Sequence, residues 1–270
     1  MNNIGVKMAE SVLKTVVIYT FVLLLALVFA TAFIFLPAYV HHVESHVPGG
    51  FDSLYLSKFS PYSTIVVEID YQPGMEPDPK AMAALQEKLE QYSQKQVVIY
   101  LNQEIGYDEV PILISGNDLF DLTNNLKQAH RDYRTGWLGG NITLYIMYLD
   151  TVWQPDNSEY SSNMPAYQYM TNTRVYSAGV TYAADSMIIF RDALTQEDTE
   201  TTILLHELGH IWGLDHSNVS GDVMNSEFNV YNSVPLNHES GINQFPTNYS
   251  SGDTLRLTRL HESLHILPFF

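Results

Sequence analysis

The sequence predicts an α+β domain that follows a single membrane-spanning helix. Three observations lead to this fold class. An apolar run lies near the N-terminus, β-branched runs alternate with amphipathic helical patterns from residue 63 onward, and 46% of the 270 residues are hydrophobic, enough for a substantial core. We therefore divide the chain into a cytoplasmic segment (1–14), a membrane helix (15–37), a stalk or linker (38–62) and a folded domain (63–270).

The apolar run extends from Thr15 to Leu36 without a charge and is long enough, as a helix, to cross about 30 Å of hydrocarbon. Lys7 and Lys14 precede it and the next basic residue is Lys58, so the positive-inside rule places the N-terminus in the cytoplasm and the remainder outside. We predict a single-pass protein of the cell membrane, with the lipid bilayer as a partner. The alternative is a cleavable signal peptide processed at "ATA" (30–32), which would yield a secreted protein.

The charge balance disfavours one class of partner. Thirteen Lys and Arg face thirty Asp and Glu, which gives a formal net charge of -17. Nucleic acid needs a basic surface, so we predict no nucleic-acid partner. The absence of cysteine excludes disulfides and thiolate metal sites.

The elements of the folded domain follow in order after the stalk, in which polar residues show no periodicity. A β-branched run at 63–71 predicts a strand that ends before Pro73. Asp78 and Pro79 provide an N-cap and a first-turn proline for a helix that carries Met82, Leu85 and Leu89. A second strand is predicted at 96–101, a second helix at 117–134 and a third strand at 141–149.

The second half of the domain begins with a long aperiodic stretch and ends with two predicted helices. Residues 150–176 lack any period and predict a long loop, and two short strands are predicted at 178–184 and 186–193, followed directly by a helix. A last helix begins near Asp253 and is stopped by Pro268.

The pattern His-Glu-x-x-His occurs twice. On a helix, residues four apart lie on one face, so two such imidazoles can share one metal ion. Catalytic zinc takes three protein ligands. His261, Glu262 and His265 are followed only by Ile-Leu-Pro-Phe-Phe, which contains no third ligand, so we interpret them as the solvent-facing polar side of the terminal helix.

The upstream copy can be completed. His206, Glu207 and His210 are followed by Gly213, which can end the helix in a left-handed turn, and then by His216. These three histidines predict a site for one Zn²⁺. Glu207 stands beside the first ligand and is predicted to be the general base that activates water for attack on a peptide carbonyl.

These residues, with Met224 eight positions beyond His216, resemble the long zinc signature and Met-turn of the metzincin metallopeptidases, and Ser217 makes them most similar to the matrixin branch. The resemblance implies a zincin-like fold with a twisted mixed β-sheet, an active-site helix and a C-terminal helix. It also implies that Met224 forms a hydrophobic floor under the ligands. The cysteine switch of many matrixins cannot operate, because the chain has no cysteine.

The resemblance further implies an exposed edge strand at 178–183 that pairs with an extended substrate, through Gly179, Val180, Thr181 and Tyr182. It implies as well an apolar substrate-pocket wall after Met224. Together these features predict a zinc metalloendopeptidase that acts on proteins or peptides outside the membrane.

Two alternatives to a peptidase stay open, a catalytically inactive zinc-binding surface protein and an anchored structural protein without metal. A Ca²⁺ site is a further possibility, for which the candidate ligands are Asp150, Asp156, Asp185 and Asp192. Their spacing does not match a calcium-binding loop, so we favour the interpretation that they are solvated carboxylates in loops.

Overall fold

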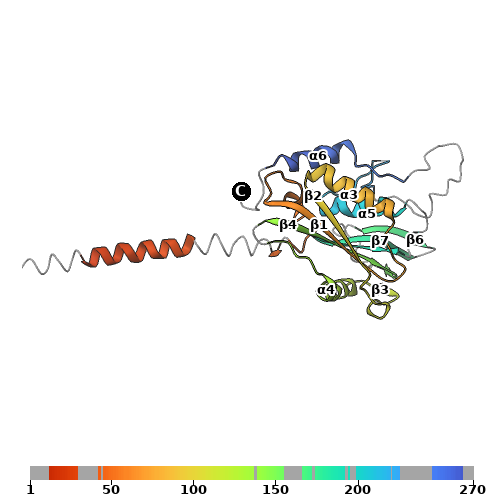
Figure 1. The fold of residues 1–270 in the computed structure, drawn as a ribbon, viewed down its shortest axis with the longest axis horizontal. Helices are drawn as coiled ribbons and strands as arrows, with labels where there is room; N and C mark the ends of the chain where they lie inside the picture. The colour runs from red at the N-terminus through yellow and green to blue at the C-terminus, as the bar shows by residue number, and fades with distance from the viewer. Residues whose placement is uncertain are drawn as a thin grey trace, which may run out of the picture. The chain divides into compact units, whose positions relative to one another are not determined.

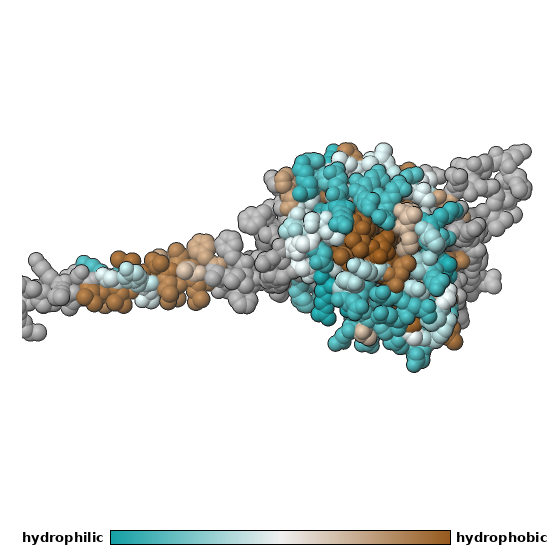
Figure 2. Space-filling model, viewed as in Figure 1, coloured by the Kyte–Doolittle hydropathy of each residue, from teal (hydrophilic) through white to brown (hydrophobic). Residues whose placement is uncertain are grey.

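A computed structural model describes residues 12–29, 42–43, 45–136, 139–154, 166–171, 174–191, 194, 199–219, 221–225 and 245–263. The chain divides into two compact units, Met1–Val43 and Glu44–Phe270. The first unit contains a helix, Val12–Phe29, with a mean hydropathy of 2.5. Figure 2 shows a largely apolar surface on this helix. A helix of this length and composition can cross a membrane, and a signal sequence has the same properties. The predicted apolar helix is confirmed for 15–29, whereas residues 30–37 lie outside the described residues.

The second unit is built on one mixed sheet with the strand order β2-β1-β4-β8-β7-β5-β3, in which β6 also pairs with β7. Neighbours from β2 to β8 are parallel, and β7 is antiparallel to β8, β5 and β6. Strand β1, which lies between β2 and β4, is buried along most of its length, as expected for a strand covered on both faces. The described strands are β1 (Tyr62–Tyr71), β2 (Gln96–Asn102), β3 (Leu113–Ser115), β4 (Gly140–Leu149), β5 (Val152–Gln154), β6 (Ala166–Thr171), β7 (Arg174–Ala183) and β8 (Ser186–Phe190).

Helices cover both faces of the sheet. Figure 1 shows α3, α5 and α6 on one face and α4 on the other. Every residue of α5 is buried, because this helix lies between the sheet and α3. The described helices of this unit are α2 (Asp52–Leu56), α3 (Pro79–Ser93), α4 (Asp118–His130), α5 (Thr199–Ile211) and α6 (Ser251–His261), with a 3₁₀ turn at Tyr107–Glu109. The predicted α+β class with a mixed sheet, an active-site helix and a C-terminal helix is confirmed.

The structure differs from the predicted stalk over residues 45–62. Phe51, Tyr55 and Leu56 are buried in the core of the folded unit. The Tyr55 hydroxyl donates to the carbonyl of Thr143 in β4 at 2.6 Å. This segment lacks helical periodicity because α2 is only five residues long, so its apolar residues gave no pattern that would mark them as core.

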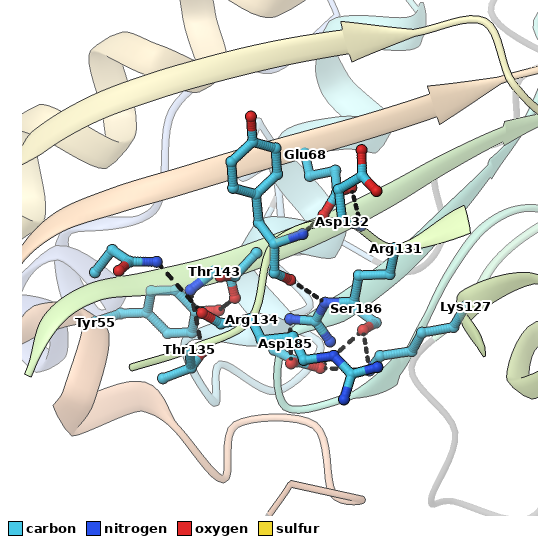
Figure 3. Close-up of polar contacts among 12 residues, drawn as sticks. Tyr55, Glu68, Lys127, Arg131, Asp132, Arg134, Thr135, Thr143, Asp185 and Ser186 are labelled. Carbon is cyan, nitrogen blue, oxygen red and sulfur yellow. Dashed lines mark hydrogen bonds and ion pairs between the residues drawn. The ribbon is translucent and has the colours of Figure 1, made fainter. Parts of the chain in front are cut away.

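A buried ionic cluster attaches α4 to the sheet (Figure 3). Lys127 and Arg131, both at the C-terminal end of α4, lie 2.8 and 2.9 Å from the carboxylate of Asp185 in the turn between β7 and β8. Burial alone would raise the pKa of Asp185, but the two cations together hold it below its usual value. Glu68 of β1 fixes the chain beyond α4 by accepting the backbone N–H groups of Asp132 and Tyr133. Asp185 is therefore buried and paired with two cations, which is not the environment of the solvated carboxylate that the sequence predicts. Asp156 and Asp192 lie outside the described residues.

Other boundaries also differ from the sequence-based expectations. The predicted loop at 150–176 contains β5 and β6 and the start of β7. The helix α4 ends at His130 instead of near 134, and α6 ends at His261, before Pro268. The apolar stripes of these helices continue beyond the hydrogen-bonded turns, and a stripe alone does not say where the last turn lies.

Candidate metal centre

The active-site helix ends where the sequence predicts. Helix α5 carries His206, Glu207 and His210 and ends at Ile211. Gly213 has a φ of 72°, and its N–H donates to the carbonyl of His210 at 3.0 Å. This left-handed turn reverses the chain and brings His216 next to His206, on the face of the helix that carries His206 and His210.

The three imidazoles converge. The Nε2 atoms of His206 and His216 are 3.2 Å apart, as are those of His206 and His210. One ligand atom from each histidine lies within 4.8 Å of the others. The structure thus brings together all three predicted ligands.

Hydrogen bonds at the opposite ring nitrogens define the chemistry of this group. Nδ1 of His206 lies 2.8 Å from the carbonyl of Val223, and Nδ1 of His210 lies 2.8 Å from the carbonyl of Leu214. A carbonyl only accepts, so each Nδ1 carries the proton and each Nε2 presents a lone pair. Lone pairs that face one another at 3.2 Å repel unless a cation lies between them. The donor set therefore fits a tetrahedral ion with nitrogen ligands, which is the geometry of zinc.

The electrostatics also favour neutral imidazoles. Burial lowers the pKa of His206 to about 3. Burial, together with the two neighbouring histidines, holds the pKa of His210 well below its ordinary value. Desolvation lowers the pKa of His216 too, although its ring is the most exposed of the three. All three rings are consequently in the metal-binding form at neutral pH.

Glu207 is fully buried beside this group and is held by strand β7. The Thr181 hydroxyl lies 2.8 Å from Oε2 of Glu207 and 2.9 Å from its backbone carbonyl. Gly179 lets the strand approach the helix closely, because a Cβ at that position would lie 2.9 Å from Cγ of Glu207. Thr181 and Gly179, which the sequence predicts as substrate contacts, thus lie against Glu207, and their pairing with a substrate stays a prediction.

Met224 lies under the helix. A Cβ on Gly209 would lie 2.2 Å from Sδ of Met224, so the thioether packs directly on the helix backbone at a position where only glycine fits. The carbonyl of Met224 accepts the N–H of Ser217 at 2.8 Å, which ties this turn to the residue after His216.

The predicted edge strand is not exposed over its whole length. Gly179 pairs with Ile189 of β8 and also with Tyr167 of β6, which must lie on opposite edges of β7. Strand β6 therefore covers the outer edge of β7 from Arg174 to Val180. Strand β6 has no counterpart among the predicted strands, because it lies within an aperiodic stretch of the sequence.

The downstream His-Glu pattern has a structural role. His261 is buried, against the expectation that it meets solvent, and its Nδ1 lies 2.8 Å from the carbonyl of Leu56. Glu262 is exposed and pairs with Lys58. His265 lies outside the described residues, as does the predicted pocket wall at 226–244.

Sequence reasoning also missed Asp222, a carboxylate only 2% exposed that contacts residues near the third histidine. No motif spacing marks it, because its partners come from separate parts of the chain.

Comparison with known proteins gives one family match. Residues 124–244 match the matrixin family model. No curated protein matches. The match includes the three histidines, Glu207 and Met224, and confirms the resemblance to a metzincin-type zinc metallopeptidase.

Several solved structures are similar at low identity, and three of them follow. Archaemetzincin from Archaeoglobus fulgidus, complexed with malonate, is 11% identical with a TM-score of 0.41, over 71% of this chain and 99% of that one. Archaemetzincin from Methanopyrus kandleri is 13% identical with a TM-score of 0.45, over 73% of this chain and 96% of that one. Metalloproteinase-II from Bacteroides fragilis is 12% identical with a TM-score of 0.42, over 74% of this chain and 54% of that one.

Proposed function

We propose that this chain, a metzincin-type zinc metallopeptidase by its signature and its matrixin match, is a membrane-anchored endopeptidase whose catalytic domain lies outside the cytoplasm. The observation that carries the proposal is the convergence of the three Nε2 atoms beside a buried carboxylate. Residues 63–270 are assigned to the catalytic domain, together with residues 45–62, which pack into it.

The roles of the residues follow from their positions. His206, His210 and His216 would hold one Zn²⁺, which, when bound, polarises a carbonyl and lowers the pKa of water towards about 7. Glu207 would accept the proton of the attacking water and pass it to the departing amine. Thr181 keeps the carboxylate of Glu207 in place through its hydroxyl. Met224 packs against the backbone of α5 at Gly209, which lies between the two histidines of that helix.

Protein or peptide substrates would bind by pairing with β7. Because β6 already holds the outer edge from Arg174 to Val180, an extended substrate that uses this part of the edge has to replace β6. Backbone pairing on both sides of the cleaved bond requires a continuous chain, and this supports cleavage within chains.

The N-terminal helix would act as the anchor, with Lys14 on its cytoplasmic side. Alkaline extraction of membranes tests this assignment: an anchored protein stays in the pellet, whereas a cleaved, secreted protein appears in the medium without residues 12–29.

The main alternative is a zinc-binding surface protein without catalysis. The buried Glu207 favours an enzyme, since three histidines are sufficient to hold the ion and a buried carboxylate is costly to keep without a role.

Full-length protein in detergent should cleave casein or a quenched peptide, lose this activity with a zinc chelator and regain it when zinc is added back. Glu207→Gln should retain zinc and lower kcat/KM by about 10²–10⁴-fold, because the base is removed and the ligands stay. Cleavage at the wild-type rate by the Glu207→Gln protein would refute the assigned base. Release of terminal residues only would refute the endopeptidase assignment.

A further inference from the structure

Asp222 is a buried carboxylate that joins three separate segments around the candidate metal centre. It is 2% exposed. Its Oδ2 accepts the hydroxyl of Ser217 at 2.6 Å, and its Oδ1 accepts the backbone N–H groups of Met224 and Ser250, both at 3.1 Å. Ser217 follows the third histidine, Met224 lies in the turn under α5, and Ser250 is the N-cap of α6.

Two of the three histidines depend on the segment that Asp222 holds. Ser217 directly follows His216, so the bond from Ser217 to Asp222 fixes the position of the third ligand. Val223 directly follows Asp222, and its carbonyl orients the ring of His206 by accepting from Nδ1. The N–H of Val223 in turn donates to the carbonyl of Asn248 at 3.0 Å, which ties the same segment to the chain before α6.

A carboxylate suits this position better than an amide. The Ser217 hydroxyl and the N–H groups of Met224 and Ser250 all donate to Asp222, and both oxygens of a carboxylate can accept. The Ser217 oxygen also accepts the N–H of Val219 at 3.1 Å, so its own hydrogen needs an acceptor. Asp253 also contacts this carboxylate; burial raises the pKa of Asp253 and its hydrogen bond with Asp222 acts in the same direction. Asparagine would present an NH₂ group either to Ser217 or to the two backbone donors.

We infer that Asp222 is a positioning residue for zinc, which sets the places of His216 and His206 without touching the ion. The inference rests on the proposed function, since it concerns the same centre. It predicts that loss of the carboxylate weakens metal affinity through geometry and not through the loss of a nearby charge.

Zinc affinity, measured by competition with a chromogenic chelator on full-length protein, provides a test that needs no catalysis. Asp222→Asn should bind zinc about 10–100-fold more weakly, the usual effect of losing a residue that orients metal ligands. The matched control is Asp215→Asn, which removes the same charge one residue from His216, at a side chain that is 95% exposed with Arg256 at 3.6 Å. Solvent screens that charge, so its removal should change affinity less than about threefold.

A second variant covers the case in which Asp222→Asn fails to fold. Ser217→Ala removes one of the three hydrogen bonds and leaves Asp222 with its two backbone donors, so it should weaken zinc binding by several-fold. In the double variant the two effects should not add, because both act through the same bond. Thermal unfolding in the presence of chelator separates the roles, since a residue that only stabilises the fold lowers the zinc-free Tm and leaves the affinity of the folded protein unchanged.

Wild-type affinity in both Asp222→Asn and Ser217→Ala would overturn the positioning role and leave the proposed function intact. An equal loss in Asp222→Asn and Asp215→Asn would also overturn it, in favour of simple charge. A wild-type protein that bound no zinc would overturn the proposed function together with this inference.

Discussion

Gly49→Ala tests how residues 45–62 pack against the end of the helix α5. Gly49 has a φ of 78°, and a Cβ at this position would lie 2.6 Å from Cα of Gly213 and 3.2 Å from its nitrogen. Gly213 is itself left-handed, at 72°, and cannot move freely. Gly74 is a matched control, because its φ is 77° while the nearest atom to its Cβ would be the Tyr107 hydroxyl at 3.8 Å.

The expected magnitudes follow from two effects. Alanine in a left-handed conformation costs about 1–2 kcal/mol at either site. Only Gly49→Ala adds the overlap with the backbone of Gly213, which costs about 1–3 kcal/mol. We therefore expect Gly49→Ala to lower the free energy of unfolding by about 2–5 kcal/mol and Gly74→Ala by about 1–2 kcal/mol.

A displaced Gly213 would also shift Leu214, whose carbonyl orients His210, so only Gly49→Ala should weaken zinc binding. Urea unfolding of the zinc-free protein and zinc competition provide the two measurements. Equal values for the two variants in both assays would refute the reasoning and return residues 45–62 to the role of a stalk.

Two further predictions concern pH and substrate access. Burial lowers the pKa of His206 from about 6.5 in the unfolded chain to about 3 in the folded protein. Between these two pH values the unfolded state therefore binds more protons than the folded state. The free energy of unfolding of the zinc-free protein should consequently fall as the pH drops from about 6.5 towards about 3. Denaturant unfolding at pH 7 and pH 5 measures this fall, which should be shallower in His206→Gln, and a stability that rises on acidification would contradict it. The second prediction tests whether a substrate has to replace β6. Met170 and Val175 lie opposite each other in the β6–β7 ladder, and the chain has no cysteine. A Met170→Cys/Val175→Cys variant can therefore form a single disulfide that holds β6 on β7. The oxidised variant should lose cleavage of long peptides and regain it on reduction, with the single-cysteine variants as controls; full activity when locked would show that substrates do not replace β6.

The sequence predicted the features that depend on local spacing. His206 and His210 share a face because they are four residues apart on a helix, and Gly213 ends that helix because the turn needs a positive φ. Asp78 caps α3 as predicted, by accepting the N–H of Lys80. Such features involve residues within one or two turns of each other, so periodicity and residue type are sufficient to predict them.

The tertiary structure alone decided which distant residues meet. Tyr55 reaches β4, His261 binds the carbonyl of Leu56, and Asp222 joins Ser217 to Ser250, at separations in sequence that no periodic pattern encodes. The cover of β7 by β6 belongs to the same class, since strand edges are indistinguishable in sequence until the pairing is known. Local spacing thus specified the three histidine ligands of the candidate centre. Long-range packing specified the residues that hold these ligands in place, such as Asp222, and the strand β6 that covers the edge of β7.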